Sequence, residues 1–159
     1  MRLVIVRHGK AQQDSEDGTD FARALRGRGE RQAAYVGEQL RREEPAVAKI
    51  VSSRAARAWR TAQIIGERVG IAVEADDALL VDEPVGVVIE RIASWASGVH
   101  GALVLVGHNP QLSVLAGLLG GGGVGSAVGL GTGEAAVIEI NPDEPIGGTL
   151  LDRIRLVED

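Results

Sequence analysis

The sequence predicts a three-layer α/β/α sandwich with a mostly parallel central sheet and an antiparallel C-terminal strand. Two short runs, at residues 3–6 and 102–106, consist almost entirely of Val, Leu and Ile, as is typical of strands buried on both faces. Segments with apolar residues at helical spacing lie between the apolar runs, and this alternation favours a parallel sheet covered by helices. Because the chain has only one Phe, one Tyr and two Trp among its 159 residues, the core must be aliphatic.

The first half of the chain alternates strand and helix. The strand at residues 3–6 is followed by a polar stretch at 11–19 that we expect to form a loop. Residues 29–43 carry apolar or small side chains at i, i+3, i+4 and i+7, and residues 54–69 carry them at i, i+4, i+7 and i+11, which predicts two amphipathic helices. The short apolar run at 48–51 between them is expected to be the second strand.

The elements of the third quarter are shorter. Residues 71–74 are expected to form an edge strand, and an irregular acidic stretch follows them. Pro84 suits the first turn of a helix whose apolar positions extend to Trp95, so Trp95 is expected to lie in the core. The run at 102–106 is the fourth strand.

The last quarter contains a helix and two strands. Asn109 and Pro110 are suited to the N-cap and first position of a helix. The glycine-rich stretch at 117–133 is expected to be a mobile loop. Residues 135–140 and 149–157, separated by turn-forming residues, predict a closing antiparallel pair of strands.

Composition narrows the possible functions. A net charge of −5 argues against a general nucleic-acid binder, and zero cysteines excludes disulfides, thiolate catalysis and cysteine-ligated metals. We expect one domain over residues 1–159. No apolar run approaches membrane-spanning length and no signal peptide is visible, so a cytoplasmic protein without membrane contact is expected.

Polar side chains follow three of the predicted strands. Arg7 and His8 come after the first, residues 53–57 after the second, and His108 with Asn109 after the fourth. Ligands of open α/β sheets collect outside the carboxyl ends of the strands, so we expect these groups to converge. The planar guanidinium fork of arginine donates two hydrogen bonds and keeps its charge, which suits a phosphate oxyanion.

These segments also carry a family resemblance, to the histidine phosphatase superfamily, whose members share the phosphoglycerate mutase-like fold. The short chain is most similar to the SixA-like phosphohistidine phosphatases. Arg54 stands where many members have Pro, and Ala24 likewise, but neither change removes a reacting group. The resemblance rests on Val6-Arg7-His8-Gly9, Ser53-Arg54-Ala55-Ala56-Arg57-Ala58-Trp59-Arg60-Thr61-Ala62, Val106-Gly107-His108-Asn109, and on Asp20, Arg23, Leu25, Gly29 and Gln32-Ala33 at matching spacing.

The resemblance implies a metal-independent phosphatase with no cofactor. His8 would be the nucleophile that accepts the phosphoryl group, Arg7 and Arg57 would hold its oxygens, and His108 would donate to the same oxygens. The physics agrees, because neighbouring cations disfavour protonated His8 and stabilise the charge of the transferred group. The implied substrate is a protein phosphohistidine.

Several alternatives stay open. The chain could instead act on a small phosphate ester, or be a non-catalytic phosphate-binding module, although the intact His8 argues against the latter. Arg23 could reach the phosphate or simply pair with Asp20. Glu83 is a candidate acid for the leaving group, since related enzymes place an acidic residue in this region, but loop carboxylates are usually solvated. The sequence does not reveal the oligomeric state or the pathway.

Overall fold

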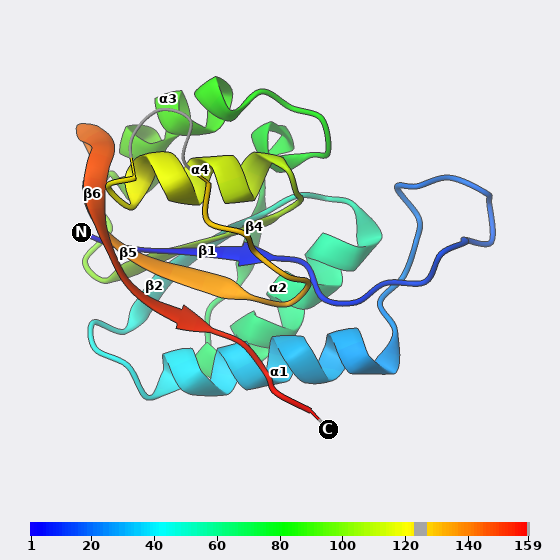
Figure 1. Ribbon diagram of the computed structural model, residues 1–159. Coiled ribbons are helices and arrows are strands. Elements are labelled where there is room, and N and C mark those ends of the chain that lie inside the picture. Colours follow the sequence, from blue (N-terminus) through cyan, green and yellow to red (C-terminus); the bar gives the residue numbers. More distant parts are fainter. Residues whose placement is uncertain (123–126, 159) are drawn as a thin grey trace.

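A six-stranded sheet forms the centre of the molecule, which is known from a computed structural model that describes residues 1–122 and 127–158 (Figure 1). The strand order is β3-β2-β4-β1-β5-β6. In chain order the elements are β1 (Arg2–Arg7), α1 (Gly27–Arg41), β2 (Val47–Ser52), α2 (Ala56–Val69), β3 (Val73–Ala75), the 3₁₀ turn η1 (Asp77–Leu79), α3 (Val85–Ala96), β4 (Ala102–Gly107), α4 (Gln111–Leu119), β5 (Ala135–Asn141) and β6 (Glu144–Ile154).

The sheet is mostly parallel, as predicted. Strand β1 pairs in parallel with β4, β4 with β2, and β2 with β3. Strand β5 is antiparallel to β1, and β6 is antiparallel to β5, so β5 alone runs against the other five strands. The predicted closing antiparallel pair is therefore confirmed.

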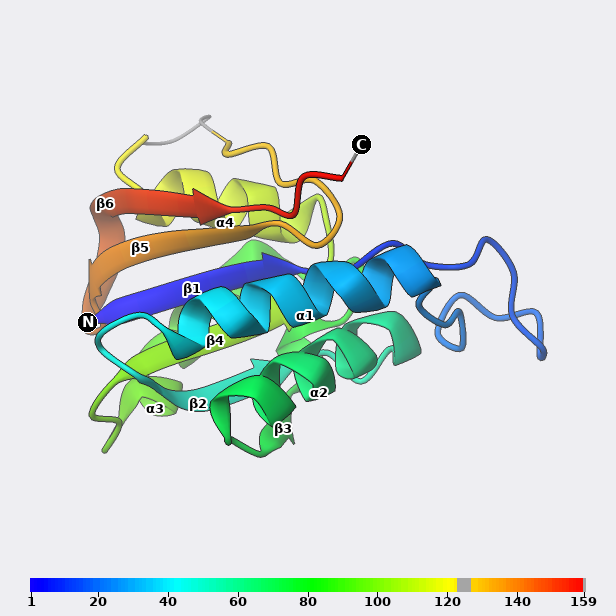
Figure 2. The same cartoon turned by 90° about the horizontal axis from the view of Figure 1, so that it is seen from below.

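Helices cover both faces of the sheet. Figures 1 and 2 show α1 and α2 on one face and α3 and α4 on the other. Alternate residues of β1 point to opposite sides: Val4 and Val6 pack in the cluster under α1 and α2, whereas Leu3 and Ile5 pack in the cluster under α3 and α4. Each face of this strand is buried, which explains why its sequence is a continuous apolar run.

Two segments differ from the expectation from sequence. The prediction of a loop over the glycine-rich residues 117–133 is wrong for the first three of them, which complete α4. Residues 127–133 are irregular, but they are anchored, because Val128 donates its amide hydrogen to Ser113 and Gly133 donates to Arg7 and His8. Residues 123–126 lie outside the described residues.

The last strand is longer than its sequence indicates. Strand β6 begins at Glu144 rather than 149, and the turn shrinks to residues 142–143. Pro145 and the following glycines weaken the strand signal, but an edge strand tolerates proline because one side needs no ladder bond. Among the described residues, no helix is long and apolar enough to cross a membrane.

The start of α1 lies directly against the chain that leaves β1. A Cβ built on Gly9 would lie 2.5 Å from the Gly29 carbonyl oxygen, and one on Gly29 would overlap the Lys10 carbonyl. The Arg26 amide donates to that same Lys10 oxygen at 2.8 Å. Only glycine permits this close backbone approach, which seats α1 against the end of β1.

We predict that Gly29→Ala lowers the free energy of unfolding by about 1–3 kcal/mol, because the added methyl must push two backbone segments apart. The matched control is Gly86→Ala, since Gly86 also lies in the first turn of a helix but a methyl group added there would meet no atom within 4 Å. That change should be neutral or stabilising by up to about 1 kcal/mol. Denaturant titration measures both, and equal effects would contradict the proposed contact.

Candidate active site

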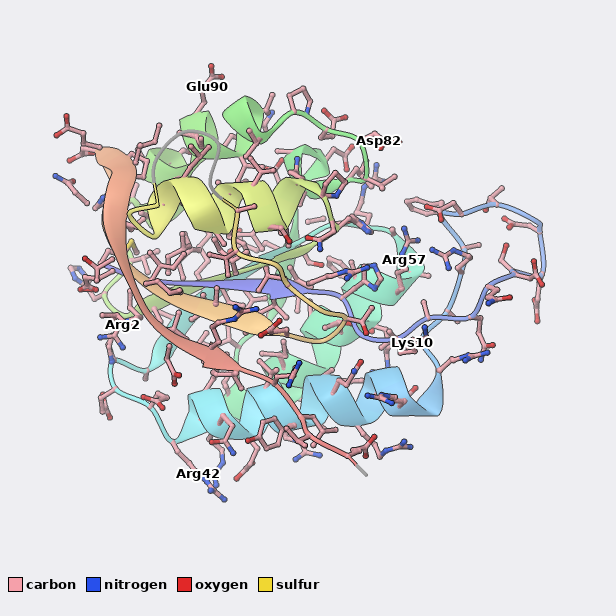
Figure 3. All side chains as sticks on the ribbon, in the orientation of Figure 1. Arg2, Lys10, Arg42, Arg57, Asp82 and Glu90 are labelled. Atoms are coloured by element: carbon pink, nitrogen blue, oxygen red, sulfur yellow. The ribbon has the colours of Figure 1, made fainter. Side chains whose placement is uncertain are left out.

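The three polar segments meet at one edge of the sheet. Parallel pairing continues just past the strands, because the His8 amide donates to Gly107 and the Ser53 amide donates to Val106, each at 3.0 Å. Figure 3 shows Arg57 and Lys10 near the end of β1, with Arg2 at the opposite end of the sheet. The convergence expected at the carboxyl ends of the strands is therefore present in the structure.

These segments enclose a cleft of about 320 Å³. Its floor is buried, since His8 is 8%, Arg57 2% and His108 2% exposed. Its rim is open, with Val81 38% exposed and the Asp20 side chain 53% exposed. The lining residues are Arg7, His8, Lys10, Ala11, Asp20, Arg23, Arg57, Val81, His108, Asn109 and Thr132.

His8 is held as a neutral imidazole with a defined tautomer. Its Nδ1 lies 2.8 Å from the Gly9 carbonyl oxygen, which can only accept, so Nδ1 carries the proton. Its Nε2 accepts a hydrogen bond from Arg57 Nε at 3.3 Å. Burial lowers the pKa of His8 to about 4, and the charges of Arg57, Arg7 and Arg23 act in the same direction. The side chain thus presents a lone pair at Nε2 near neutral pH.

Arg57 is fixed by a carboxylate from the loop between β1 and α1, which projects beyond the sheet (Figures 1 and 2). Its Nη1 and Nη2 donate to the backbone oxygen and Oδ2 of Asp20 at 2.8 and 2.9 Å. Arg23 Nε donates to Asp20 Oδ1 at 3.0 Å. Burial opposes ionisation of Asp20, but the hydrogen bonds and charges of Arg57 and Arg23 hold its pKa below the usual value. Asp20 therefore partly offsets the positive charge of the cleft.

Arg7 approaches the cleft from the other side. Its Nη1 donates to the Leu130 carbonyl at 3.0 Å, and Asn109 Nδ2 donates to the same oxygen at 2.9 Å. Burial lowers the pKa of Arg7. Its Nε is buried and has no hydrogen-bond partner among the described residues, so one of its donors is not engaged within the described part of the protein. The segment after α4 thus orients two cleft residues.

His108 lies beside His8, with ring centroids 5.3 Å apart. Burial lowers its pKa to about 3, and the charge of Arg57 contributes to the shift. Its Nε2 lies 2.8 Å from Ser53 Oγ. Its Nδ1 is buried without a partner in the described part of the chain.

Five of the six site residues considered from the sequence line the cleft, and one does not. Arg7, His8, Arg57 and His108 all line the cleft, and Arg23 both lines it and pairs with Asp20. Glu83 is not a lining residue, and its backbone oxygen accepts a hydrogen bond from Gln111. Val81, two residues earlier in the same loop, lines the cleft instead.

Two contacts at the cleft and behind it gave little signal in the sequence. The contribution of Asp20 depends on how a long loop folds back, and the contact of Ser53 with His108 joins two strand ends. Among residues 1–122 and 127–158, no group of three or more His, Cys, Asp or Glu side chains is placed to hold a metal ion.

The buried histidines predict a pH-dependent stability. In the unfolded chain each binds a proton near pH 6.5, whereas in the folded protein His8 does so only near pH 4 and His108 near pH 3. Between about pH 4 and 6.5 the unfolded state binds more protons, so the free energy of unfolding falls as the pH falls.

Denaturant midpoints measured across this window should therefore depend less on pH in His108→Gln than in the wild type. His100→Gln, which changes a histidine outside the cleft, is the control and should keep the wild-type slope. An unchanged slope in His108→Gln would contradict the buried neutral state.

Comparison with known proteins places this geometry in context. No curated protein sequence matches the chain. The solved structure of the protein histidine phosphatase SixA complexed with tungstate has a TM-score of 0.84 at 21% identity, covering 98% of this chain and 97% of that chain. The α-ribazole phosphatase from Shigella flexneri has a TM-score of 0.71 at 19% identity and covers 100% of both chains.

A mycobacterial glucosyl-3-phosphoglycerate phosphatase complexed with VO₃ has a TM-score of 0.65 at 24% identity, over 94% of this chain and 96% of that chain. At these identities the likeness establishes the fold. The sequence itself matches the family model of the histidine phosphatase superfamily (branch 1) over residues 3–80, which include Arg7, His8 and Arg57. The chain thus matches the histidine phosphatase superfamily over residues 3–80 and shares the fold of the SixA structure over 98% of its length.

Proposed function

We propose that this phosphatase hydrolyses phosphohistidine on a protein, through a covalent phosphohistidine at its own His8. The observation that carries the proposal is the state of His8: a buried neutral imidazole, with its proton held on Nδ1 and a lone pair on Nε2. Arg7 and Arg57 line the same cleft, so the charge that develops on a transferred phosphoryl group would be stabilised by fixed donors.

The proposed reaction has two displacements. In the first, the His8 Nε2 lone pair forms a bond to phosphorus while the N–P bond of the substrate breaks, and the leaving imidazole takes a proton from water. In the second, water attacks the phosphorus of phosphorylated His8, the new N–P bond breaks, and inorganic phosphate leaves with release of a proton, which neutralises the hydroxide formed in the first step. Arg57 Nε, which now donates to Nε2, would turn to a phosphoryl oxygen in the first step. Arg7, Arg57 and His108 supply the charge and donors, so the proposal requires no metal.

The acidic groups that line the cleft favour a phosphoramidate substrate over a phosphate ester. An alkoxide leaving group needs a proton from a well-placed acid, whereas an imidazole leaves more readily. Asp20 is the only carboxyl group among the described lining residues, and its pKa is lowered by Arg57 and Arg23 although burial acts against this. It is therefore a carboxylate at neutral pH and a poor proton donor. Glu83, the acid considered from the sequence, does not line the cleft.

A small phosphate ester is the second candidate substrate. Two of the similar structures are named as an α-ribazole phosphatase and a glucosyl-3-phosphoglycerate phosphatase. The exposed rim around Val81 and Asp20 could admit such a molecule as well as a protein side chain. Relative catalytic efficiency separates the two candidates.

We predict that brief incubation with a ³²P-phosphohistidine protein labels the wild-type chain with acid-labile, base-stable phosphate. His8→Ala should carry no label, because the attacking nitrogen is absent. His100→Ala, which leaves the cleft intact, is the control and should be labelled normally. Label that persists in His8→Ala would refute the assignment of the nucleophile.

EDTA should leave labelling unchanged, and a loss of label that Mg²⁺ or Mn²⁺ restores would refute metal independence.

We also predict a preference for protein substrates in kcat/KM. The open rim grips little of a small ester beyond its phosphate, whereas a docked protein gains binding energy from contacts around the cleft. A phosphohistidine protein should be hydrolysed far more efficiently than 3-phosphoglycerate, sugar phosphates or an aryl phosphate. The advantage should shrink with a short phosphohistidine peptide. If one small metabolite were hydrolysed with equal or higher efficiency, the chain would instead be a phosphatase of small phosphate esters.

A further inference from the structure

A buried serine stands behind the second histidine of the cleft. Ser53 is the first residue after β2, is fully buried, and is not one of the residues that line the cleft. Its Oγ lies 2.8 Å from His108 Nε2 and accepts a hydrogen bond from the Ala55 amide at 3.2 Å. Ser53 therefore connects the end of β2, the start of α2 and the imidazole that follows β4.

Counting protons decides the direction of the Ser53–His108 hydrogen bond. The Ser53 hydroxyl has one hydrogen, and His108 Nε2 is the only side-chain acceptor that its Oγ contacts among the described residues. If Nε2 carried the proton, the serine hydrogen would be buried without an acceptor. Nδ1 would then also be a buried acceptor without a donor, so two polar groups would be unpaired, whereas the opposite arrangement leaves only the Nδ1 hydrogen unpaired. The additional unpaired group disfavours the Nε2–H arrangement by roughly five- to a hundredfold. The serine is therefore the donor and Nε2 the acceptor.

The opposite ring nitrogen then has a defined role. His108 is neutral, because burial and the charge of Arg57 lower its pKa to about 3, so its single ring proton must reside on one nitrogen. With Nε2 accepting, the proton lies on Nδ1, which is buried and has no partner in the described part of the chain. His108 lines the cleft next to His8. His108 thus retains one N–H that no other described group engages.

We propose that Ser53 is a positioning residue that holds the ring proton of His108 on Nδ1, so that a neutral imidazole donates a hydrogen bond to the transferred phosphoryl group. The catalytic part rests on the proposed function, whereas the tautomer itself does not. In the other tautomer, Nδ1 would direct a lone pair at the phosphoryl oxygens and repel them. Ser53 thus sets whether His108 attracts or repels the group being transferred.

The tautomer can be read directly from the ¹⁵N chemical shifts of protein labelled at its histidine ring nitrogens. At neutral pH, wild-type His108 should show a protonated Nδ1 and an unprotonated Nε2. Added tungstate should shift the Nδ1 signal, because the oxyanion accepts its hydrogen bond. Ser53→Ala should shift population toward the Nε2–H tautomer, and kcat/KM should fall by roughly three- to tenfold, the scale of one net hydrogen bond.

Ser52→Ala is the matched control. Ser52 is equally buried at the same strand end, but its hydroxyl donates to the Ser53 backbone oxygen and does not contact His108. This variant should keep the wild-type tautomer and nearly the wild-type kcat/KM.

Two outcomes would overturn the inference: an Nε2–H tautomer in the wild type, or an unchanged Nδ1–H tautomer in Ser53→Ala. The wild-type spectrum provides this test even if the variant does not fold. Absence of phosphoryl label on His8 together with the expected tautomer would refute the nucleophile and leave the role of Ser53 toward His108 standing.

Discussion

Parallel pairing of β1 with β4 and of β4 with β2 is the constraint on which the rest of the structure depends. The hydrogen bonds from His8 to Gly107 and from Ser53 to Val106 extend this pairing beyond the strands. Three chain segments that are distant in sequence therefore leave the sheet side by side. The helices add rigidity from the same edge, since Thr61 of α2 donates to the Arg57 carbonyl and accepts from the Gly9 amide.

Electrostatics in the cleft depends on how little water reaches its floor. Two buried imidazoles beside guanidinium groups stay neutral, and neutrality gives each nitrogen a separate role as donor or acceptor. Gly9 sets the tautomer of His8 through a backbone carbonyl, and Ser53 contacts the ring of His108 through a hydroxyl. The cleft thus combines fixed positive charge, held by Arg7 and Arg57, with imidazoles that do not compete for protons near neutral pH.

Local pattern was sufficient to predict the sheet and the principal cleft residues. Burial on both faces makes β1 recognisable as a strand, and the rule for strand ends places Arg7, His8 and His108 at one edge. Contributions set by long-range contacts could not be predicted in this way. Asp20 reaches Arg57 only because its loop is folded back by the Ala11–Leu25 bridge and the Gln12–Ala24 hydrogen bond. Similarly, the end of α4 and the start of β6 could not be predicted, because their glycines have weak helix and strand propensity. Packing in the folded protein outweighs this weak propensity.

For the engaged N–H groups of Arg57, capture of a ligand is an exchange of hydrogen-bond acceptors. Three of its N–H groups are already engaged, by His8 Nε2, by the Asp20 backbone oxygen and by Asp20 Oδ2. An incoming oxyanion that takes any of these donors replaces an existing acceptor and does not fill a vacant position. Its affinity is therefore set by the difference between two acceptors, which is smaller than the strength of the new contact alone. The same free-energy difference applies to inorganic phosphate, the product. An arginine whose N–H groups are already engaged therefore binds the released anion less tightly than an arginine without such partners would.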